Sequence, residues 1–312
     1  MTRLRVGVVG VGALGQHHAR ILAAMPWVDL VGVADTRADR AREVAATYGT
    51  TPCGAAALVG KVDAVCIATP TRSHVEVALP FVEAGVAVLV EKPLAAGLAE
   101  ADRLLEAAEA RGALVATGHT ERFNPAVTAA LQVVSHPKFV EIHRLGTFPE
   151  RSLDIDVVFD LMIHDLDLLL AAVGSDVASV EAVGVNVLTP RVDIANARLR
   201  FASGCIANVT ASRISRDRVR KARFFQSDAY ISIDYAAQEL EVYRLVSGNG
   251  GRPVIEGGRV EVTGEEPLRR ELEDFVAAVR DRRAPTVTGR DGRAALALAT
   301  RIAELFEGSD TP

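Results

Sequence analysis

A run of glycines near the N-terminus has the spacing of a dinucleotide-binding loop. Gly10-Val11-Gly12-Ala13-Leu14-Gly15 follows an apolar run and opens a helical pattern. In such a loop the first glycine allows a tight turn, the second lets the backbone approach a pyrophosphate, and the third lets the helix pack close to the sheet. The helix would also offer free N–H groups and its positive dipole end to the phosphates. The pattern predicts that a cofactor is held by Gly10, Gly12, Ala13, Leu14 and Gly15.

An acidic residue stands where such a site needs one. Asp35 comes twenty residues after Gly15, at the end of the second predicted strand, where a carboxylate can accept hydrogen bonds from the adenosine ribose. The same carboxylate repels a 2′-phosphate, so NAD is the expected cofactor. Arg37 could hold that phosphate, and NADP therefore stays open as an alternative.

A carboxylate and an imidazole four residues apart are the second candidate for chemistry. Asp160 and His164 lie in the stretch 157–173, which has a helical pattern, and residues i and i+4 share one face of a helix. Together they could engage neighbouring hydroxyls of one substrate. Asp165 and Asp167 are also present, so an ordinary surface pair in an Asp-rich helix is the alternative. A metal site would need a third ligand that the sequence does not indicate, and we expect no metal.

The elements that must position these residues change in kind near residue 120. Before it, short β-branched runs alternate with helical patterns, which is typical of βαβ units and a parallel sheet. The predicted strands are 5–10, 28–35, 62–69, 86–90 and 113–117, and the predicted helices are 13–25, 37–48, 73–84 and 98–111. The fold class of this part is α/β, a doubly wound Rossmann sheet. Pro80 lies inside one predicted helix and should kink it or end it early.

The second part of the chain is predicted to be an α+β domain with a large, mostly antiparallel sheet, because turn signals rather than crossover helices join its β-type runs. These runs are 139–148, 177–188, 193–212, 222–235, 240–246 and 260–262, with helices at 125–134, 157–173, 266–282 and 294–307. We expect a Rossmann domain over 1–120 and a substrate-binding and oligomerisation domain over 121–312, whose final helix could pack back on the first. The uncovered face of the sheet is the expected surface of a homodimer or homotetramer.

Composition argues against several other classes of protein. The chain has 312 residues, of which 49% are hydrophobic, and a formal net charge of −5. Disorder is excluded, and nucleic acid is not an expected partner because its binding needs a basic face. The three cysteines contain no Cys-x-x-Cys pair, which suits a reducing compartment. No apolar stretch approaches the roughly 20 residues of a membrane helix, and the N-terminus lacks the pattern of a signal peptide. We expect a cytoplasmic protein that does not bind membranes.

Three further stretches, taken with the glycine loop, resemble the Gfo/Idh/MocA family. They are Ala68-Thr69-Pro70 with His74, then Glu91-Lys92-Pro93, then Asp160-x-x-x-His164. Members of that family are NAD(P)-dependent dehydrogenases of sugars and polyols. The resemblance covers the first half of the chain by motif and the second half by its β-rich texture. It therefore implies a sugar or polyol dehydrogenase.

The resemblance also implies roles for the residues around the cofactor. Thr69 and Pro70 would line the nicotinamide ribose and ring edge. The further residues expected to bind the cofactor are His74, Glu91 and Lys92. Lys92 would point at the reacting carbinol, with a cis bond before the proline that follows it. From the residues alone, Thr69 and Pro70 could form a strand-ending turn. His74 could likewise complete local hydrogen bonds, and Lys92 could be a surface lysine.

These parts predict the oxidation of a secondary alcohol by hydride transfer to the nicotinamide. Histidine has a reference pKa of about 6.5, so His164 is the expected general acid and base. The reference pKa of lysine is about 10.4, so Lys92 polarises the reacting oxygen as a cation unless its pKa is depressed. Asp160 is the expected substrate anchor.

A narrower resemblance concerns the substrate. The stretches Gly118-His119-Thr120-Glu121-Arg122-Phe123-Asn124-Pro125 and Phe159-Asp160-Leu161-Met162-Ile163-His164 are similar to those of UDP-N-acetylglucosamine 3-dehydrogenases, which oxidise a nucleotide sugar. Arg122 could hold a substrate phosphate or hydroxyl, with Asn124 beside it, or could instead form a structural salt bridge. Part of the basic cluster 213–223 could bind the diphosphate, although a solvated face is the more ordinary interpretation.

Three alternatives stay open at this level. Myo-inositol or a free sugar could be the substrate. A non-catalytic dinucleotide-binding regulator could use the same fold, but it would not need Lys92, Asp160 and His164 together. An enzyme that oxidises transiently and then cleaves a glycosidic bond would release no net NADH.

Overall fold

The computed structural model describes residues 3–148, 155–247 and 253–307. The chain divides into two units. The first comprises Met1–Thr120 and Leu268–Leu296, and the second comprises Glu121–Pro267 and Ala297–Pro312. A segment near the C-terminus therefore belongs to the unit that is otherwise formed by the N-terminal part of the chain.

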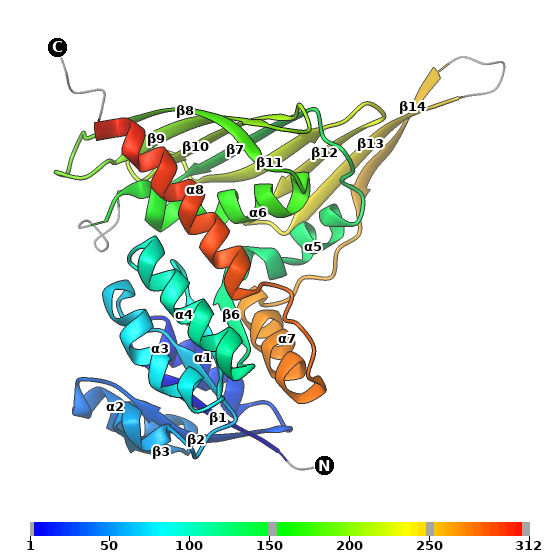
Figure 1. The fold of residues 1–312 in the computed structure, drawn as a ribbon. Helices are drawn as coiled ribbons and strands as arrows, with labels where there is room; N and C mark the ends of the chain where they lie inside the picture. The colour runs from blue at the N-terminus through cyan, green and yellow to red at the C-terminus, as the bar shows by residue number, and fades with distance from the viewer. Residues whose placement is uncertain (1–2, 149–154, 248–252, 308–312) are drawn as a thin grey trace. The chain divides into compact units, whose positions relative to one another are not determined.

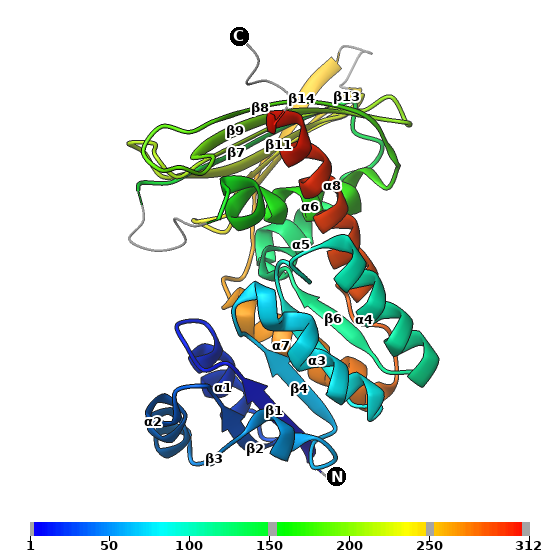
Figure 2. The ribbon, with the colours of Figure 1, turned by 60° about the vertical axis from the view of Figure 1, so that its left-hand side comes forward.

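The first unit is built on a six-stranded sheet in which every pairing is parallel (Figures 1 and 2). In spatial order the strands are β3 (Thr51–Cys53), β2 (Val28–Ala34), β1 (Leu4–Val9), β4 (Ala64–Ile67), β5 (Ala87–Glu91) and β6 (Val115–Gly118). The chain winds outward in both directions from β1 and β4, which confirms the predicted doubly wound sheet. Ligands of such sheets bind at the carboxyl ends of the strands where the order reverses.

Helices cover both faces of this sheet. They are α1 (Gly15–Ala23), α2 (Ala38–Tyr48), α3 (His74–Glu83), α4 (Leu98–Arg111) and α7 (Pro267–Asp281). Leu22 of α1 and Phe275 of α7 share one buried core with Val8 of β1, while α3 and α4 lie side by side on the other face (Figures 1 and 2). Burial on both faces explains why β4 and β5 are apolar along nearly their whole length.

Of the two outcomes predicted at Pro80, a kink or an early end of the helix, the early end is wrong. Helix α3 continues through Pro80 to Glu83. Pro80 has no N–H to donate to the Glu76 carbonyl, and both residues are exposed. Water can therefore satisfy that carbonyl, and the helix tolerates the proline. The short strand β3 was not predicted from the sequence.

The second unit is built on an eight-stranded sheet, and all but one of its pairings are antiparallel, as predicted. The exception is the parallel pair of β7 and β10. In spatial order the strands are β14 (Pro253–Val260), β13 (Glu239–Ser247), β12 (Ala229–Asp234), β11 (Val219–Phe225), β7 (Phe139–Leu145), β10 (Ile206–Ser212), β9 (Ile194–Phe201) and β8 (Val177–Val185).

Among the described residues, the helices of the second unit lie on one face of its sheet. Helices α5 (Pro125–Leu131) and α6 (Ile163–Val173) lie along it, and α8 (Gly289–Glu307) starts in the first unit and ends in the second (Figure 1). The predicted alternation in β9 is confirmed, because Ala195, Ala197, Leu199 and Phe201 are all buried. The opposite face carries the half-buried and exposed residues of each strand.

The position of the last strand in the chain differs from the prediction. Strand β14 covers Pro253–Val260 rather than 260–262, although Gly257 and Gly258 are typical of a turn. Both adopt positive φ angles, +133° and +147°, and a Cβ at Gly257 would clash with the Val242 carbonyl of β13. The glycines therefore let the strand continue beside its neighbour rather than turn away.

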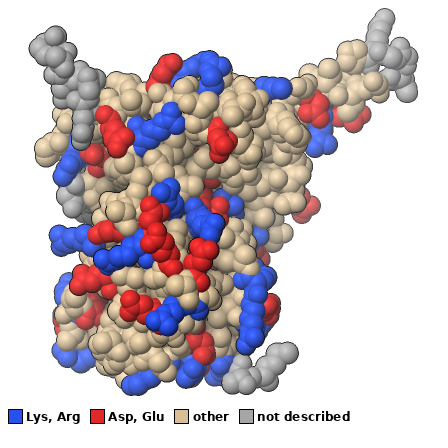
Figure 3. Space-filling view, viewed as in Figure 1, with Lys and Arg blue, Asp and Glu red and all other residues tan. Residues whose placement is uncertain are grey.

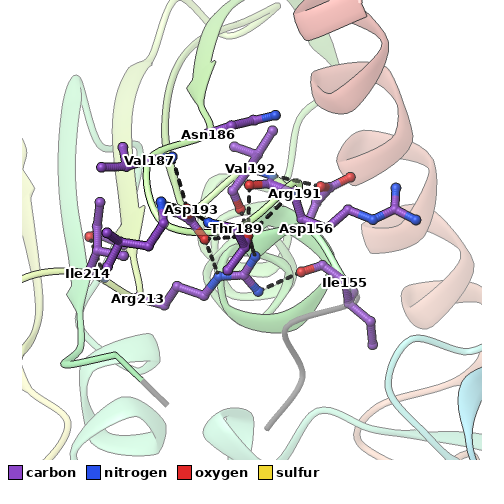
Figure 4. A network of polar contacts seen from close by, with 12 residues as sticks. Ile155, Asp156, Asn186, Val187, Thr189, Arg191, Val192, Asp193, Arg213 and Ile214 are labelled. Carbon is purple, nitrogen blue, oxygen red and sulfur yellow. Dashed lines mark hydrogen bonds and ion pairs between the residues drawn. The ribbon is translucent and has the colours of Figure 1, made fainter. Parts of the chain in front are cut away.

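A buried ionic network fixes the loop between β8 and β9 in the second unit (Figure 4). Asp193, which is fully buried, accepts backbone N–H bonds from Val187, Leu188 and Thr189 at 2.9, 2.6 and 2.9 Å. Arg213 donates its Nε–H to the same carboxylate at 2.9 Å and Nη1–H to the Ile155 carbonyl at 2.6 Å. Burial alone would raise the pKa of Asp193, but the N–H groups and the Thr189 hydroxyl outweigh it and hold the pKa well below its usual value.

We predict that Asp193→Asn destabilises the protein at pH 7 by about 3–5 kcal/mol, because it leaves the Arg213 charge buried without its counter-ion. The native pKa of Asp193 lies below the unfolded value of about 3.9, so its contribution is full above that value and is lost as the pH falls through the acid range. Urea unfolding from pH 7 to pH 3 should therefore show the two proteins converging. Asp176→Asn, at an exposed carboxylate of the same unit, is the control. A constant difference across this range would contradict the prediction.

Candidate functional site

The glycine loop joins β1 to α1 and is held against the end of β4. Gly10 has a φ of +83°, and a Cβ on it would lie 2.6 Å from the Ala68 carbonyl oxygen. A Cβ on Gly15 would collide with the Gly10 carbonyl oxygen. Gly12 differs, because a Cβ there would meet no atom within 4 Å. Two of the glycines are therefore required for packing inside the protein, whereas the third leaves its backbone open to solvent.

The exposed part of the loop can bind an anion. Among the described residues, none accepts a hydrogen bond from the backbone N–H groups of Gly12, Ala13 or Leu14, and all three residues are exposed. These groups stand directly before the nine-residue helix α1, whose N-terminal end carries a partial positive charge. This is the arrangement that holds the pyrophosphate of a dinucleotide.

Asp35 lies beside this loop, at the end of β2. Its carboxylate accepts the N–H of Val11 and the N–H of Arg37, each at 2.9 Å, and its half-buried position leaves oxygen lone pairs for a ribose. The side chain of Arg37 is exposed.

Arg40 is a residue of this site that the sequence did not reveal. It donates to the Val11 carbonyl at 2.9 Å and to the Gln16 side chain at 2.7 Å, and so ties α2 to the glycine loop. Nothing in its sequence position separates it from the other charged residues of an exposed helix.

The ends of β4 and β5 are linked by a buried histidine. One ring nitrogen of His74 lies 2.8 Å from the Thr69 carbonyl, and the other lies 2.9 Å from the Pro93 carbonyl. Burial lowers the pKa of His74, although both carbonyls and the Glu91 carboxylate offset part of this effect. Because its ring nitrogens contact both carbonyls, His74 holds the ends of the two strands in position.

Thr69 offers a polar group at the same place. Its hydroxyl oxygen is buried and has no hydrogen-bond partner among the described residues, which marks a position where a ligand can supply one. Pro70 follows it on the surface. The free N–H groups, the open space at Gly12 and this hydroxyl fit a dinucleotide along the strand ends.

Glu91 and Lys92 close strand β5. Glu91 is only 5% exposed, and its Oε1 lies 2.9 Å from Nε2 of His18, a fully buried residue of α1. Lys92 is half-buried, and the Lys92–Pro93 bond is cis, as the resemblance implied. His18 is a second residue that the sequence did not reveal, because a histidine inside a helix has many structural explanations.

Asp160 and His164 lie on a helix of unexpected geometry in the second unit. The predicted continuous helix consists of a π-helical segment, η4 (Val158–Met162), followed by α6. Asp160 belongs to the π segment and His164 to the first turn of α6. Both are half-buried, whereas Met162 and Ile163 between them are fully buried. π segments occur often at functional sites.

Buried ion pairs attach α6 to the rest of the second unit. Asp165, directly after His164, forms a two-pronged pair with Arg144 of β7 at 2.7 and 2.9 Å. Burial raises the pKa of Asp165, and Arg144 offsets part of this rise. Arg144 also contacts Glu121 at 3.0 Å. The aspartates of this helix are therefore not a solvated face, which was the alternative interpretation.

The two predicted substrate residues near position 120 lie in this same framework. Arg122 approaches Asp167 at 3.4 Å, while its Nε is buried without a hydrogen-bond partner among the described residues. Asn124 is 2% exposed, caps α5 through the Ala126 N–H and donates to the Tyr235 carbonyl at 2.9 Å. Asn124 thus has structural bonds of its own, whereas Arg122 keeps donor capacity.

The basic cluster 213–223 is largely engaged in contacts within the protein. Arg213 is buried against Asp193, Lys221 pairs with Asp234 at 3.3 Å, and Arg223 pairs with Glu141 at 3.2 Å. Figure 3 shows acidic and basic side chains interspersed on the face drawn there.

Within the described residues, no group of three or more His, Cys, Asp or Glu side chains is placed to hold a metal ion. In the same residues, no helix combines the length and the apolar character needed to cross a membrane.

The first unit thus brings together the glycine loop, Asp35, Thr69, His74, Glu91 and Lys92 at the carboxyl ends of its strands. The second unit places Asp160 and His164 on one helix. Lys92 and His164 belong to different units, and their convergence on one carbon stays a prediction.

A Rossmann sheet whose glycine loop has unbonded backbone N–H groups, with an acidic residue after β2, is typical of a dinucleotide-binding domain. Two family models match the chain: residues 4–119 match the oxidoreductase family with an NAD-binding Rossmann fold, and residues 136–232 match the GFO/IDH/MocA C-terminal domain. The chain belongs to the Gfo/Idh/MocA family.

Similar proteins within the family oxidise sugars and polyols. The chain is 40% identical over 305 residues to the UDP-N-acetylglucosamine 3-dehydrogenase of Acidithiobacillus ferrooxidans, covering 97% of each chain. A solved structure of that enzyme superposes with a TM-score of 0.92 over 99% of both chains. The myo-inositol 2-dehydrogenase of Thermotoga maritima is 28% identical, over 95% of this chain and 94% of its own. Levoglucosan dehydrogenase in complex with NADH, at 20% identity and a TM-score of 0.88 over 98% of both chains, shares the fold.

We predict that Gly12→Ala and Gly15→Ala fail in different ways. Gly12→Ala should fold with an unchanged melting temperature but bind NAD at least about tenfold more weakly, because its methyl group projects where the pyrophosphate must approach. Gly15→Ala should lose about 1–3 kcal/mol or more of stability, because its methyl group overlaps the Gly10 carbonyl. Thermal unfolding and NAD titration by calorimetry measure the two effects. Equal melting temperatures for both variants would contradict this division of roles.

Proposed function

We propose that the protein oxidises the 3-hydroxyl of UDP-N-acetylglucosamine, with NAD as the hydride acceptor. The observation that carries this proposal is the pair of half-buried side chains, Asp160 and His164, held on one helix by the buried Arg144–Asp165 pair. The identity of 40% over 97% of the chain to a UDP-N-acetylglucosamine 3-dehydrogenase supports the choice of substrate.

His164 is the proposed general base of this reaction. Its imidazole removes the proton of the substrate hydroxyl, and NAD, when bound, would supply the hydride acceptor for the same carbon. Lys92 places its ammonium on the reacting oxygen and stabilises the negative charge that develops there. Asp160 accepts a hydrogen bond from a neighbouring hydroxyl and orients the sugar ring. This assignment requires Lys92 and His164 to meet at one carbon of the substrate.

The cofactor-side residues have distinct proposed roles. Backbone N–H groups of Gly12, Ala13 and Leu14 would hold the pyrophosphate, and Asp35 would accept hydrogen bonds from the ribose hydroxyls. Thr69 would offer its hydroxyl to the nicotinamide end of the cofactor, and Pro70 would line the same end. His74 acts as a positioning residue, since its ring nitrogens hold the carbonyls of Thr69 and Pro93. Arg37, exposed beside Asp35, contacts the adenosine end.

The nucleotide part of the substrate needs a cation, and Arg122 is the proposed one. Its long contact with Asp167 and its unpartnered Nε leave it able to hold a phosphate oxygen. Asn124 supports this loop by capping α5 and holding the Tyr235 carbonyl. A free sugar or inositol would not use such a group, so comparing UDP-sugars with free sugars and inositols under the same conditions tests the substrate class.

We predict that His164→Ala lowers kcat by about 10²–10⁴-fold, the contribution of a general base. NADH formation from UDP-N-acetylglucosamine, followed by absorbance, measures the loss, and the Kd for NAD should change less than twofold. Lys92→Met should lower kcat by a comparable factor. His136→Asn, at an exposed position with positive φ that asparagine also tolerates, serves as the control. Undiminished turnover in His164→Ala would refute the role of the imidazole, and no NADH from any hydroxylated substrate would favour a regulator.

The open sheet face of the second unit is the proposed contact with a second copy of the chain, in a protein we place in the cytoplasm. Four half-buried aromatic rings cross adjacent strands on this face, with centroid separations of 5.6, 5.2 and 6.2 Å between Phe139, Phe225, Tyr230 and Tyr243 in turn. A continuous aromatic row on an uncovered face gains stability when another copy buries it.

We predict that Tyr230→Arg converts an oligomer into a smaller species. A cation in the centre of the aromatic row would be desolvated by assembly, which should weaken association by at least about tenfold. Sedimentation velocity at several protein concentrations measures the change. Trp27→Arg, at an exposed aromatic of the first unit, is the matched control. An unchanged sedimentation profile for Tyr230→Arg would place the interface elsewhere.

A further inference from the structure

The carboxylate of Glu91 lies in a space that a side chain at position 118 would fill. Glu91 pairs in register with Gly118 on the neighbouring strand β6. A Cβ at Gly118 would lie 2.8 Å from the carboxylate oxygen Oε2, so only glycine leaves room for this charge. The other oxygen accepts a hydrogen bond from His18 at 2.9 Å. The strand end is therefore built around a buried carboxylate, one residue before Lys92.

His18 contacts this carboxylate through one ring nitrogen only. Its second ring nitrogen, Nδ1, is buried and has no hydrogen-bond partner among the described residues. A single N–H on Nε2 satisfies the contact with Glu91, and a neutral imidazole supplies one.

A second carboxylate acts on the same interior. Glu271 of α7 is 1% exposed and accepts a hydrogen bond from the Thr120 hydroxyl at 3.2 Å. Burial raises the pKa of the Cys66 thiol, and Glu271 and Glu91 raise it further, so both charges reach this residue of β4. Among the described residues of the first unit no Lys or Arg is buried, and Lys92 is half-buried. Two buried carboxylates, and no buried Lys or Arg, therefore lie at this end of the sheet among the described residues of the first unit.

We propose that Glu91 is a specificity-determining residue for the oxidation state of the cofactor. The nicotinamide ring carries a positive charge in NAD and none in NADH, whereas the rest of the dinucleotide is the same. A fixed negative charge in a poorly solvated interior favours the cationic ring, and the interaction is screened far less than at the surface. Glu91 thus makes the site hold NAD in preference to NADH and helps to release the reduced product. The inference rests on the NAD site of the first unit and not on the identity of the sugar.

The test compares dissociation constants for NAD and NADH, measured by calorimetry without any sugar. Glu91→Gln keeps the size of the side chain and its bond to His18 but removes the charge. We expect the ratio Kd(NADH)/Kd(NAD) to fall by about 5- to 50-fold, which is the range of a typical coupling between two sites. The affinity for ADP-ribose, which lacks the nicotinamide, should change less than twofold. Glu76→Gln, at an exposed carboxylate of α3, should leave all three affinities unchanged.

Further variants separate this proposal from a purely structural role. His18→Gln should leave the ratio within twofold, because it removes no charge; a rising ratio would mean that His18 is an imidazolium and would overturn the proposal. If Glu91→Gln does not fold, Glu271→Gln should lower the ratio in the same direction by a smaller factor. Two other outcomes would also overturn the proposal. One is a ratio unchanged within twofold in Glu91→Gln, or in Glu271→Gln where Glu91→Gln does not fold. The other is a loss of affinity for NAD, NADH and ADP-ribose by one common factor. None of these outcomes depends on turnover, so failure of the proposed sugar oxidation would be seen separately.

Discussion

The close approach of the glycine loop to the end of β4 is the constraint on which the first unit depends. Gly10 can turn only because a positive φ is available to it, and its backbone lies where a side chain would strike the Ala68 carbonyl. This contact fixes the start of α1 relative to β4. His74 then ties β4 to the end of β5 through two carbonyls. The positions of Thr69 and Lys92 therefore follow from one tight turn and one buried imidazole.

In the second unit, buried charges rather than close backbone packing fix the positions of the elements. Arg144 and Arg213 are each almost fully buried, and each meets a fully buried aspartate. Such pairs add little net stability, because desolvation offsets much of the attraction, but a misaligned pair is very costly. Their effect is to allow one arrangement only. Arg144 sets the helix that carries His164, and Arg213 holds the carbonyl of Ile155 just before the π segment.

Much of the fold could be predicted from the sequence because its signals are local. Glycine spacing, Asp35 and the alternation of strands and helices each depend on neighbouring residues, and they defined the Rossmann sheet and its loop. The mostly antiparallel sheet followed from the absence of crossover helices. Local sequence is a poor guide where solvent or a neighbouring strand decides the outcome. Helix α3 continues through Pro80 because the carbonyl that loses its N–H partner is exposed. Strand β14 continues through Gly257 because β13 leaves no room for a side chain there.

The candidate reactive groups stand in local motifs, whereas the residues that support them do not. Lys92, Asp160 and His164, whose roles are proposals, belong to short motifs of the sequence. His18, Arg40 and Arg144 contact residues more than twenty positions away, and no local pattern distinguishes them from other charged side chains. The π segment is likewise invisible to a helical period. Yet these supports decide what the reactive groups can do, because a general base or a polarising cation acts only from a fixed position in a fixed electrostatic field. Each unit therefore holds its own candidate residue in place: contacts of His74 with the backbone position the end of β5, where Lys92 lies, and the Arg144–Asp165 pair positions the helix that carries His164.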